Sequence, residues 1–148
     1  MMTKAEVLEL LKSSGKAKAQ AVQENASAMT GTELNAERDY IPSFKAACET
    51  MNMLERPYGF VCLSSAGRVV KLIQPYDSTI YTGEPETLPA QFGFVWSNNP
   101  EHALPFVAMA TSPYMTGNCC TEDGVVYRSK MDNNVHSPSA YPQRWERV

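Results

Sequence analysis

The chain has 148 residues, of which 43% are hydrophobic and 20% are charged, and its formal net charge is −3 at pH 7. This composition is typical of a globular protein and excludes a wholly disordered chain. A mildly acidic chain without a basic cluster argues against nucleic acid as the main partner. No apolar run approaches the roughly 18 residues of a membrane span. The acidic residues near the N-terminus lead us to expect no export signal.

Residues 3 to about 29 are predicted to form a helix that continues into an alanine-rich stretch. Four apolar residues near its start give it one apolar face, namely Val7, Leu8, Leu10 and Leu11. The apolar stripe thins after Leu11, and Gly15 weakens the middle of the helix. Such a helix either packs against copies of itself, in a bundle or short coiled coil, or lies partly frayed on its own domain. Both alternatives stay open.

A short second helix is predicted over residues 34–40. Thr30 and Glu33 before it have the spacing of a capping box. The helix should end there because Pro42 disfavours a helical residue before it. The sequence over residues 43–53 is consistent with either a third helix or an irregular lead-in.

From Arg56 onward, short apolar runs separated by glycine and proline predict β-structure. Strands are expected over residues 60–64 and 68–73, joined by a turn at Gly67. A long proline-containing loop follows and ends in residues 92–96.

The last third of the chain predicts a second, more compact β-unit. Its expected elements are a strand opening at Tyr114, a turn at residues 122–124, a strand over residues 125–130, a turn at residues 132–134 and a closing Trp145. We therefore predict an α+β fold with an N-terminal helical segment (1–50) followed by two small antiparallel β-modules (51–97 and 98–148).

The two predicted units share an order of elements at an interval of about 50 to 57 residues, which indicates an internal repeat. The matched positions are Gly67 with Gly124, Val69-Val70-Lys71 with Val126-Tyr127-Arg128, Asp77 with Asp132, Pro89 with Pro142 and Trp96 with Trp145.

Four cysteines fit no zinc-binding spacing, namely Cys48, Cys62, Cys119 and Cys120. Neighbouring residues of a strand point to opposite faces, so Cys119 and Cys120 are not expected to bond to each other. We predict buried or half-buried thiols, no disulfide framework, and neither a metal nor a cofactor.

Several motifs in the tail carry a resemblance to known proteins. They are Leu104-Pro105-Phe106-Val107, the run from Gly117 to Lys130, Asp132-Asn133-Asn134, Ser137-Pro138, Tyr141-Pro142 and Trp145-Glu146. This tail resembles the small chitin-binding type of carbohydrate-binding module. More closely, it looks like a family of tailed-phage and prophage structural proteins that carry one or two such modules behind a helical segment. The likeness covers roughly residues 33–148 and is most specific in about the last 45.

The resemblance implies a non-enzymatic virion protein, such as a head fibre, a capsid decoration protein or a tail accessory, assembled in the host cytoplasm. Its implied partners are itself, commonly as a trimer in fibre-like phage proteins, other virion proteins, and a cell-surface or mucosal glycan. Two alternatives stay open. One is a free carbohydrate-binding accessory module of a wall-targeting or lysis complex. The other is a pure assembly protein without sugar binding, which predicts burial of Tyr58, Phe60 and Phe92 between subunits.

Sugar recognition needs flat aromatic faces with amide groups nearby. The second module offers seven candidates, namely Tyr114, Tyr127, His136, Tyr141, Trp145, Asn133 and Asn134. Tyr127 and Trp145 are alternatively the core of a small module, and residues 132–134 alternatively a simple turn. His136 and Tyr141 lie in a proline-rich loop and are expected to be exposed. No catalytic residues are predicted, because no nucleophile, zinc or phosphate motif is present.

Overall fold

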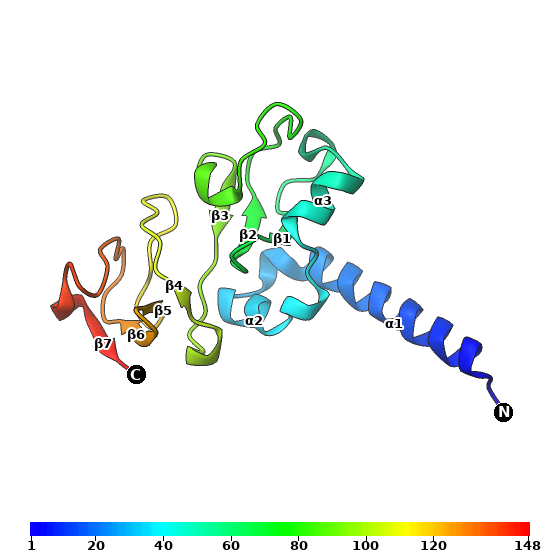
Figure 1. Ribbon diagram of the computed structural model, residues 1–148, viewed down its shortest axis with the longest axis horizontal. Coiled ribbons are helices and arrows are strands. Elements are labelled where there is room, and N and C mark those ends of the chain that lie inside the picture. Colours follow the sequence, from blue (N-terminus) through cyan, green and yellow to red (C-terminus); the bar gives the residue numbers. More distant parts are fainter.

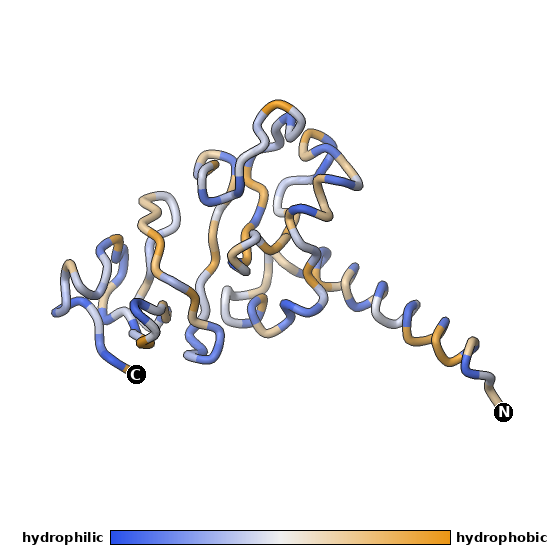
Figure 2. Tube along the Cα trace, viewed as in Figure 1, coloured by the Kyte–Doolittle hydropathy of each residue, from blue (hydrophilic) through white to orange (hydrophobic).

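The N-terminal helix projects from the rest of the molecule. In the computed structural model, which describes residues 1–148, α1 spans Lys4–Asn25 and begins at a capping box between Thr3 and Glu6. Its first half extends away from the body (Figure 1) and carries hydrophobic residues (Figure 2). Residues 1–14 are exposed, Gly15 is the first that is partly covered, and Val22 is buried. The helix therefore has a covered half and a free half.

Two short helices connect α1 to the first sheet. α2 (Gly31–Ala36) begins at the predicted capping box, because Thr30 and Glu33 satisfy each other's backbone N–H groups. A 3₁₀ turn over Arg38–Tyr40 follows, so the predicted helix over residues 34–40 starts earlier and tightens at its end. The ambiguous segment contains a helix, α3 (Phe44–Thr50), which starts where the Ser43 side chain accepts a hydrogen bond from the Ala46 N–H.

The first sheet is an antiparallel meander of β1 (Val61–Leu63), β2 (Val69–Leu72) and β3 (Phe92–Phe94). One face packs on α1 and α2 through a cluster of six buried residues, namely Val22, Ala26, Leu34, Ile41, Val61 and Val69. The other face packs on α3 and on a larger aromatic core. Both faces of this sheet are therefore covered by the chain itself.

The second sheet has the order β4 (Leu104–Pro105), β5 (Cys119–Glu122), β6 (Val125–Ser129), β7 (Trp145–Arg147). The α+β fold class is confirmed. The second sheet is mixed rather than purely antiparallel, because β4 runs parallel to β5. The strand expected to open at Tyr114 is also corrected. Tyr114 forms only an isolated bridge with Asn134, and the left-handed Gly117 (φ +96°) turns the chain before β5 begins.

A single core joins the two sheets. Its fifteen buried residues run from Phe44 to Trp145, and an aromatic stack crosses from one sheet to the other. The ring centroids of Trp96 and Tyr114 lie 4.3 Å apart, and those of Tyr114 and Trp145 lie 5.4 Å apart. The boundary predicted between residues 97 and 98 therefore separates two sheets that share one core.

Strand pairing tests the predicted repeat. With Cys62 aligned to Cys120, the pairing of Cys62 with Val70 and of Cys120 with Tyr127 places Val69-Val70-Lys71 at the positions of Val126-Tyr127-Arg128. Gly67 and Gly124 both adopt left-handed backbone in the hairpin turns.

The match of Trp96 with Trp145 is wrong. Leu72 pairs with Phe92 where Ser129 pairs with Trp145, so Phe92 is the counterpart of Trp145. Pro89 and Pro142 lie outside the paired strands, each three residues before the matched ring. Asp77 and Asp132 lie in loops that strand pairing does not align.

The cysteines are free thiols, as predicted. Cys62, Cys119 and Cys120 are buried and Cys48 is half-buried. Burial raises the pKa of the Cys62 and Cys120 thiols to about 12. Neutral, covered thiols are poor nucleophiles, so we treat them as core residues.

Candidate functional site

The loop between β6 and β7 is held at several points, which fixes the side chains that it displays. Asp132 accepts a hydrogen bond from the Thr116 N–H, and this bond lowers the pKa of the Asp132 carboxyl. The Ser139 N–H donates to the Glu122 carboxylate across the neighbouring hairpin. The Trp145 indole N–H donates to the His136 carbonyl at 2.8 Å. The loop is therefore a fixed platform rather than a free tether.

Two exposed rings meet on this platform. The ring centroids of His136 and Tyr141 lie 4.7 Å apart, with planes tilted by 34°. The turn between them is closed by hydrogen bonds from the Ala140 and Tyr141 N–H groups to the Ser137 carbonyl. Both residues are exposed, as the sequence predicted. The pair offers an apolar surface of the kind that covers the C–H face of a sugar ring.

Arg144 completes this surface. Its guanidinium carbon lies 4.2 Å from the centroid of the Tyr141 ring, in a cation–π contact. We call His136, Tyr141 and Arg144 the His136 cluster. Sequence reasoning missed Arg144, although a signal was present. Pro142 starts a 3₁₀ turn, and in such a turn residues three apart eclipse each other, which brings Arg144 over Tyr141.

The other predicted contacts lie elsewhere. Tyr114 and Trp145 are buried in the core, and Tyr127 packs against that core half-buried. Asn134 is fully buried, where its amide donates to the Ser129 hydroxyl and the Arg144 carbonyl. Asn133 takes left-handed backbone (φ +55°) in the turn before the platform. Of the seven candidates, the structure brings together only His136 and Tyr141 as an exposed pair.

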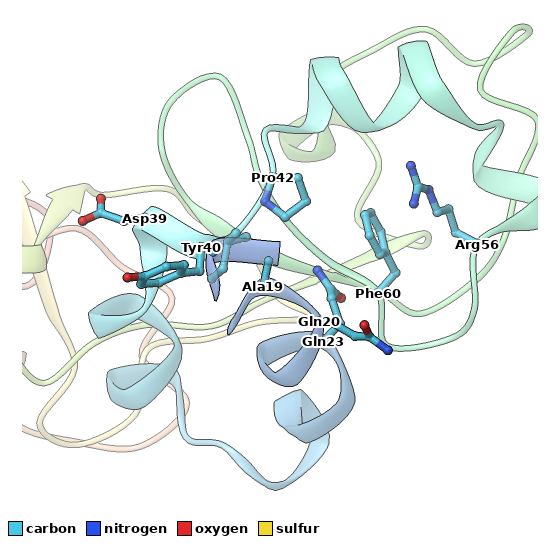
Figure 3. Close-up of a pocket in the computed structure, with 10 residues that line it drawn as sticks. Ala19, Gln20, Gln23, Asp39, Tyr40, Pro42, Arg56 and Phe60 are labelled. Carbon is cyan, nitrogen blue, oxygen red and sulfur yellow. The ribbon is translucent and has the colours of Figure 1, made fainter. Parts of the chain in front are cut away.

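A second feature is a groove of about 600 Å³ where α1 leaves the body. We call it the α1 groove. Figure 3 shows Ala19, Gln20 and Gln23 of α1 on one side, facing Tyr40, Pro42 and Phe60 of the body. The Gln23 side chain exchanges two hydrogen bonds with the Val61 backbone and so occupies part of the β1 edge. Arg56 lies over the Phe60 ring at the far end. The sequence could not reveal this groove, because its walls are far apart along the chain.

No three His, Cys, Asp or Glu side chains gather where they could hold a metal ion. No helix has the length and apolarity needed to cross a bilayer. No family model, curated protein or solved structure matches this chain at a significant level. The two surfaces and the likeness of the tail motifs are therefore the features that bear on function.

Proposed function

We propose that this protein is a non-enzymatic structural protein of a tailed-phage virion, either a head fibre, a capsid decoration protein or a tail accessory. In this role α1 mediates self-association or anchoring, and the His136 cluster makes weak contacts with a glycan. The virion assignment rests on the resemblance of the tail motifs to phage structural proteins. The division of labour within the molecule is supported by its shape.

One observation carries the proposal: the two unpartnered surfaces lie at opposite ends of an elongated molecule (Figure 1). The free half of α1 ends at the N-terminus, with Leu8 and Leu11 more than half exposed. The loop that carries the His136 cluster lies at the other end, beside β7. An attachment helix at one end and a displayed platform at the other is the arrangement that a particle-surface protein requires.

The platform is suited to weak binding. The hollows of the molecular surface lie at α1 and around α3, and the His136 cluster borders none of them. A flat site buries little of its ligand, so the affinity of one copy should be low. Many copies on one particle would raise the effective affinity without any new contact. The cationic Arg144 also offers hydrogen-bond donors to sugar hydroxyl or acidic groups.

Location is tested by immunogold electron microscopy of purified particles with an antibody to residues 98–148. Label over the capsid is expected for a head fibre or decoration protein, and label at the tail for a tail accessory. Particles without label, in infected cells that contain the protein, would overturn the virion proposal. Polysaccharide binding by the free protein would then favour an accessory module of a wall-targeting or lysis complex.

Glycan contact is tested on a polysaccharide array with the protein coupled in many copies to a bead. We expect Tyr141→Ala to weaken the binding of each copy about fivefold and so to lower the retained fraction, because one aromatic contact contributes on the order of 1 kcal/mol at each site. The matched control is Tyr58→Ala, which removes an exposed tyrosine from the first unit and should leave binding unchanged.

If the wild-type protein binds no glycan but is present on particles, an assembly role without sugar remains. The expectation that such a role buries Phe60 and Phe92 between subunits is wrong, because both are already buried in their own chain. Only Tyr58 of that group is free for a partner.

A further inference from the structure

The free half of α1 carries an apolar stripe that its own chain does not cover. Leu8 is 55% exposed and Leu11 is 65% exposed, and Val7 beside them is 42% exposed. Residues three, four or seven apart share a face of a helix. Leu8 and Leu11 are therefore on the same side of α1 as Gly15, which lines the α1 groove, and Val22, which packs on the body. The side of α1 that faces the body at Val22 is therefore also apolar at Leu8 and Leu11, where the body no longer covers it.

The α1 groove lies at that point and has room for another side chain. A Cβ atom built on Gly15 would meet no atom within 4 Å. Ala19 is the next small residue along this wall, and the exposed Tyr40 ring and Pro42 form part of the opposite wall. Small residues on one wall and apolar surface on the other are what a docking leucine needs.

The order of charges along α1 indicates which helix direction fits. Residues 4–11 of the free half carry Lys4, Glu6 and Glu9, one positive and two negative charges, whereas residues 12–18 carry three lysines and no acidic residue. In a parallel pair, the acidic segment of one helix would face the acidic segment of the other, and the lysines would face lysines. In an antiparallel pair the acidic segment faces the basic one. The contact stripe selects the same direction, because only an antiparallel pair lays the Leu8–Leu11 segment of each helix over the residue 15–19 segment of the other.

We propose that two copies of this chain pair through α1 in antiparallel orientation. Each copy lays Val7, Leu8 and Leu11 into the α1 groove of the other. The pairing is self-complementary, because a two-fold axis near Ser13 uses each contact twice. It deepens the self-association of the proposed function and replaces the expected trimer with a dimer. A specific interface buries roughly 800 Å² on each partner. Because the helix of each copy enters the groove of the other, the free half of α1 and the α1 groove of both copies all contribute to one interface.

The first test is the mass of the purified full-length chain by light scattering and sedimentation across a concentration series. We expect a dimer with a dissociation constant in the micromolar range. Gly15→Glu should raise that constant at least tenfold by blocking the groove with a charged side chain. Gly15→Ala is the matched control and should leave the dimer intact. The open space around Gly15 means that both variants keep the monomer fold, which circular dichroism verifies.

The second test concerns orientation. Leu11→Cys and Gly15→Cys chains mixed in equal amounts should form a disulfide-linked dimer on mild oxidation, because the antiparallel pair places Leu11 beside Gly15 of the partner, whereas each chain alone should form little. A monomer at all accessible concentrations would overturn the proposal. So would a trimer whose mass Gly15→Glu does not change, or a mixture that cross-links no more than either chain alone.

The pairing and the virion role can fail separately. A dimer in solution that is missing from purified particles would remove the virion role and leave the pairing. A monomer that labels particles would remove the pairing and leave the virion role.

Discussion

The two β-units place their rings in the same geometry around different residues. Phe44 of α3 meets Phe92 of the first unit edge to face, with centroids 5.7 Å apart and planes at 84°. In the second unit Phe106 meets Trp145 at 6.0 Å and 90°. A tyrosine makes the second edge contact in each case, Tyr76 to Phe92 at 5.7 Å and Tyr114 to Trp145 at 5.4 Å. The repeat is therefore a repeated packing motif that tolerates exchange of the central ring.

The two units differ in how far the rest of the chain covers their sheets. β2 is buried along most of its length, because helices cover one face of its sheet and the aromatic core covers the other. β6 is half-buried over its first four residues, since no helix covers its sheet. Leu88 lies four residues before Phe92 and packs on the core. Tyr141 lies four residues before Trp145 and is exposed. The first unit therefore acts as scaffold, and only the second displays rings to solvent.

Removing the central ring should give the largest effect in either unit. Phe92→Ala and Trp145→Ala are each expected to lower the free energy of unfolding by about 3–5 kcal/mol. Because one core joins the sheets, each variant should shift a single transition for the whole body. Urea unfolding followed by tryptophan fluorescence and circular dichroism measures this.

The control is Trp145→Phe, which gives the second unit the ring of the first. It removes the indole hydrogen bond to the His136 carbonyl and should lower stability by only about 1–2 kcal/mol. Two separate transitions, each moved by only one of the alanine variants, would show instead that the units unfold independently.

A smaller effect is expected at the joint between the units. Arg68 is buried in the first unit, where its guanidinium lies 2.8 Å from the Glu86 carboxylate and donates to the Pro105 carbonyl of the second. Arg68→Leu leaves Glu86 mostly buried without its partner and should lower stability by about 3 kcal/mol.

The double variant Arg68→Leu with Glu86→Leu should recover part of that loss, because no unpaired charge remains. Val125, the counterpart of Arg68 in the strand register, supplies the comparison. Val125→Ala should change stability by about 1 kcal/mol or less. A double variant less stable than Arg68→Leu would contradict this explanation of the joint.

The features that sequence could predict are local ones. The capping box of Thr30 with Glu33 and the glycine turns at Gly67 and Gly124 depend on residues a few positions apart. The exposure of His136 and Tyr141 follows from their proline-rich loop. These predictions are confirmed because short-range hydrogen bonding and backbone preference decide them.

The errors have a non-local cause. Matching Trp96 to Trp145 compared residue types, whereas strand register selects Phe92, and register depends on cross-strand packing. Tyr114 matches the pattern of a sugar contact, but aromatic side chains occur in cores as well as on binding surfaces. Its burial depends on Trp96, from the other sheet, stacking on it. The α1 groove depends on helix packing between distant segments and has no sequence pattern.

The smallest expected difference concerns acid. Hydrogen bonds from Thr79 and Asn52 lower the pKa of Asp77 in the first unit, and one from Thr116 lowers that of Asp132 in the second. A carboxyl with a lowered folded-state pKa adds stability above its ordinary pKa, and this is lost as pH falls through the folded value. Asp77→Asn should therefore flatten the acid side of the stability profile below about pH 4, and Asp132→Asn should flatten it less, because Asp77 has more donors. Urea midpoints measured between about pH 2.5 and pH 6 test this. A larger change for Asp132→Asn would contradict this order. It would mean that the loop carrying the His136 cluster depends more on the Asp132–Thr116 hydrogen bond than the first unit depends on the hydrogen bonds of Asp77.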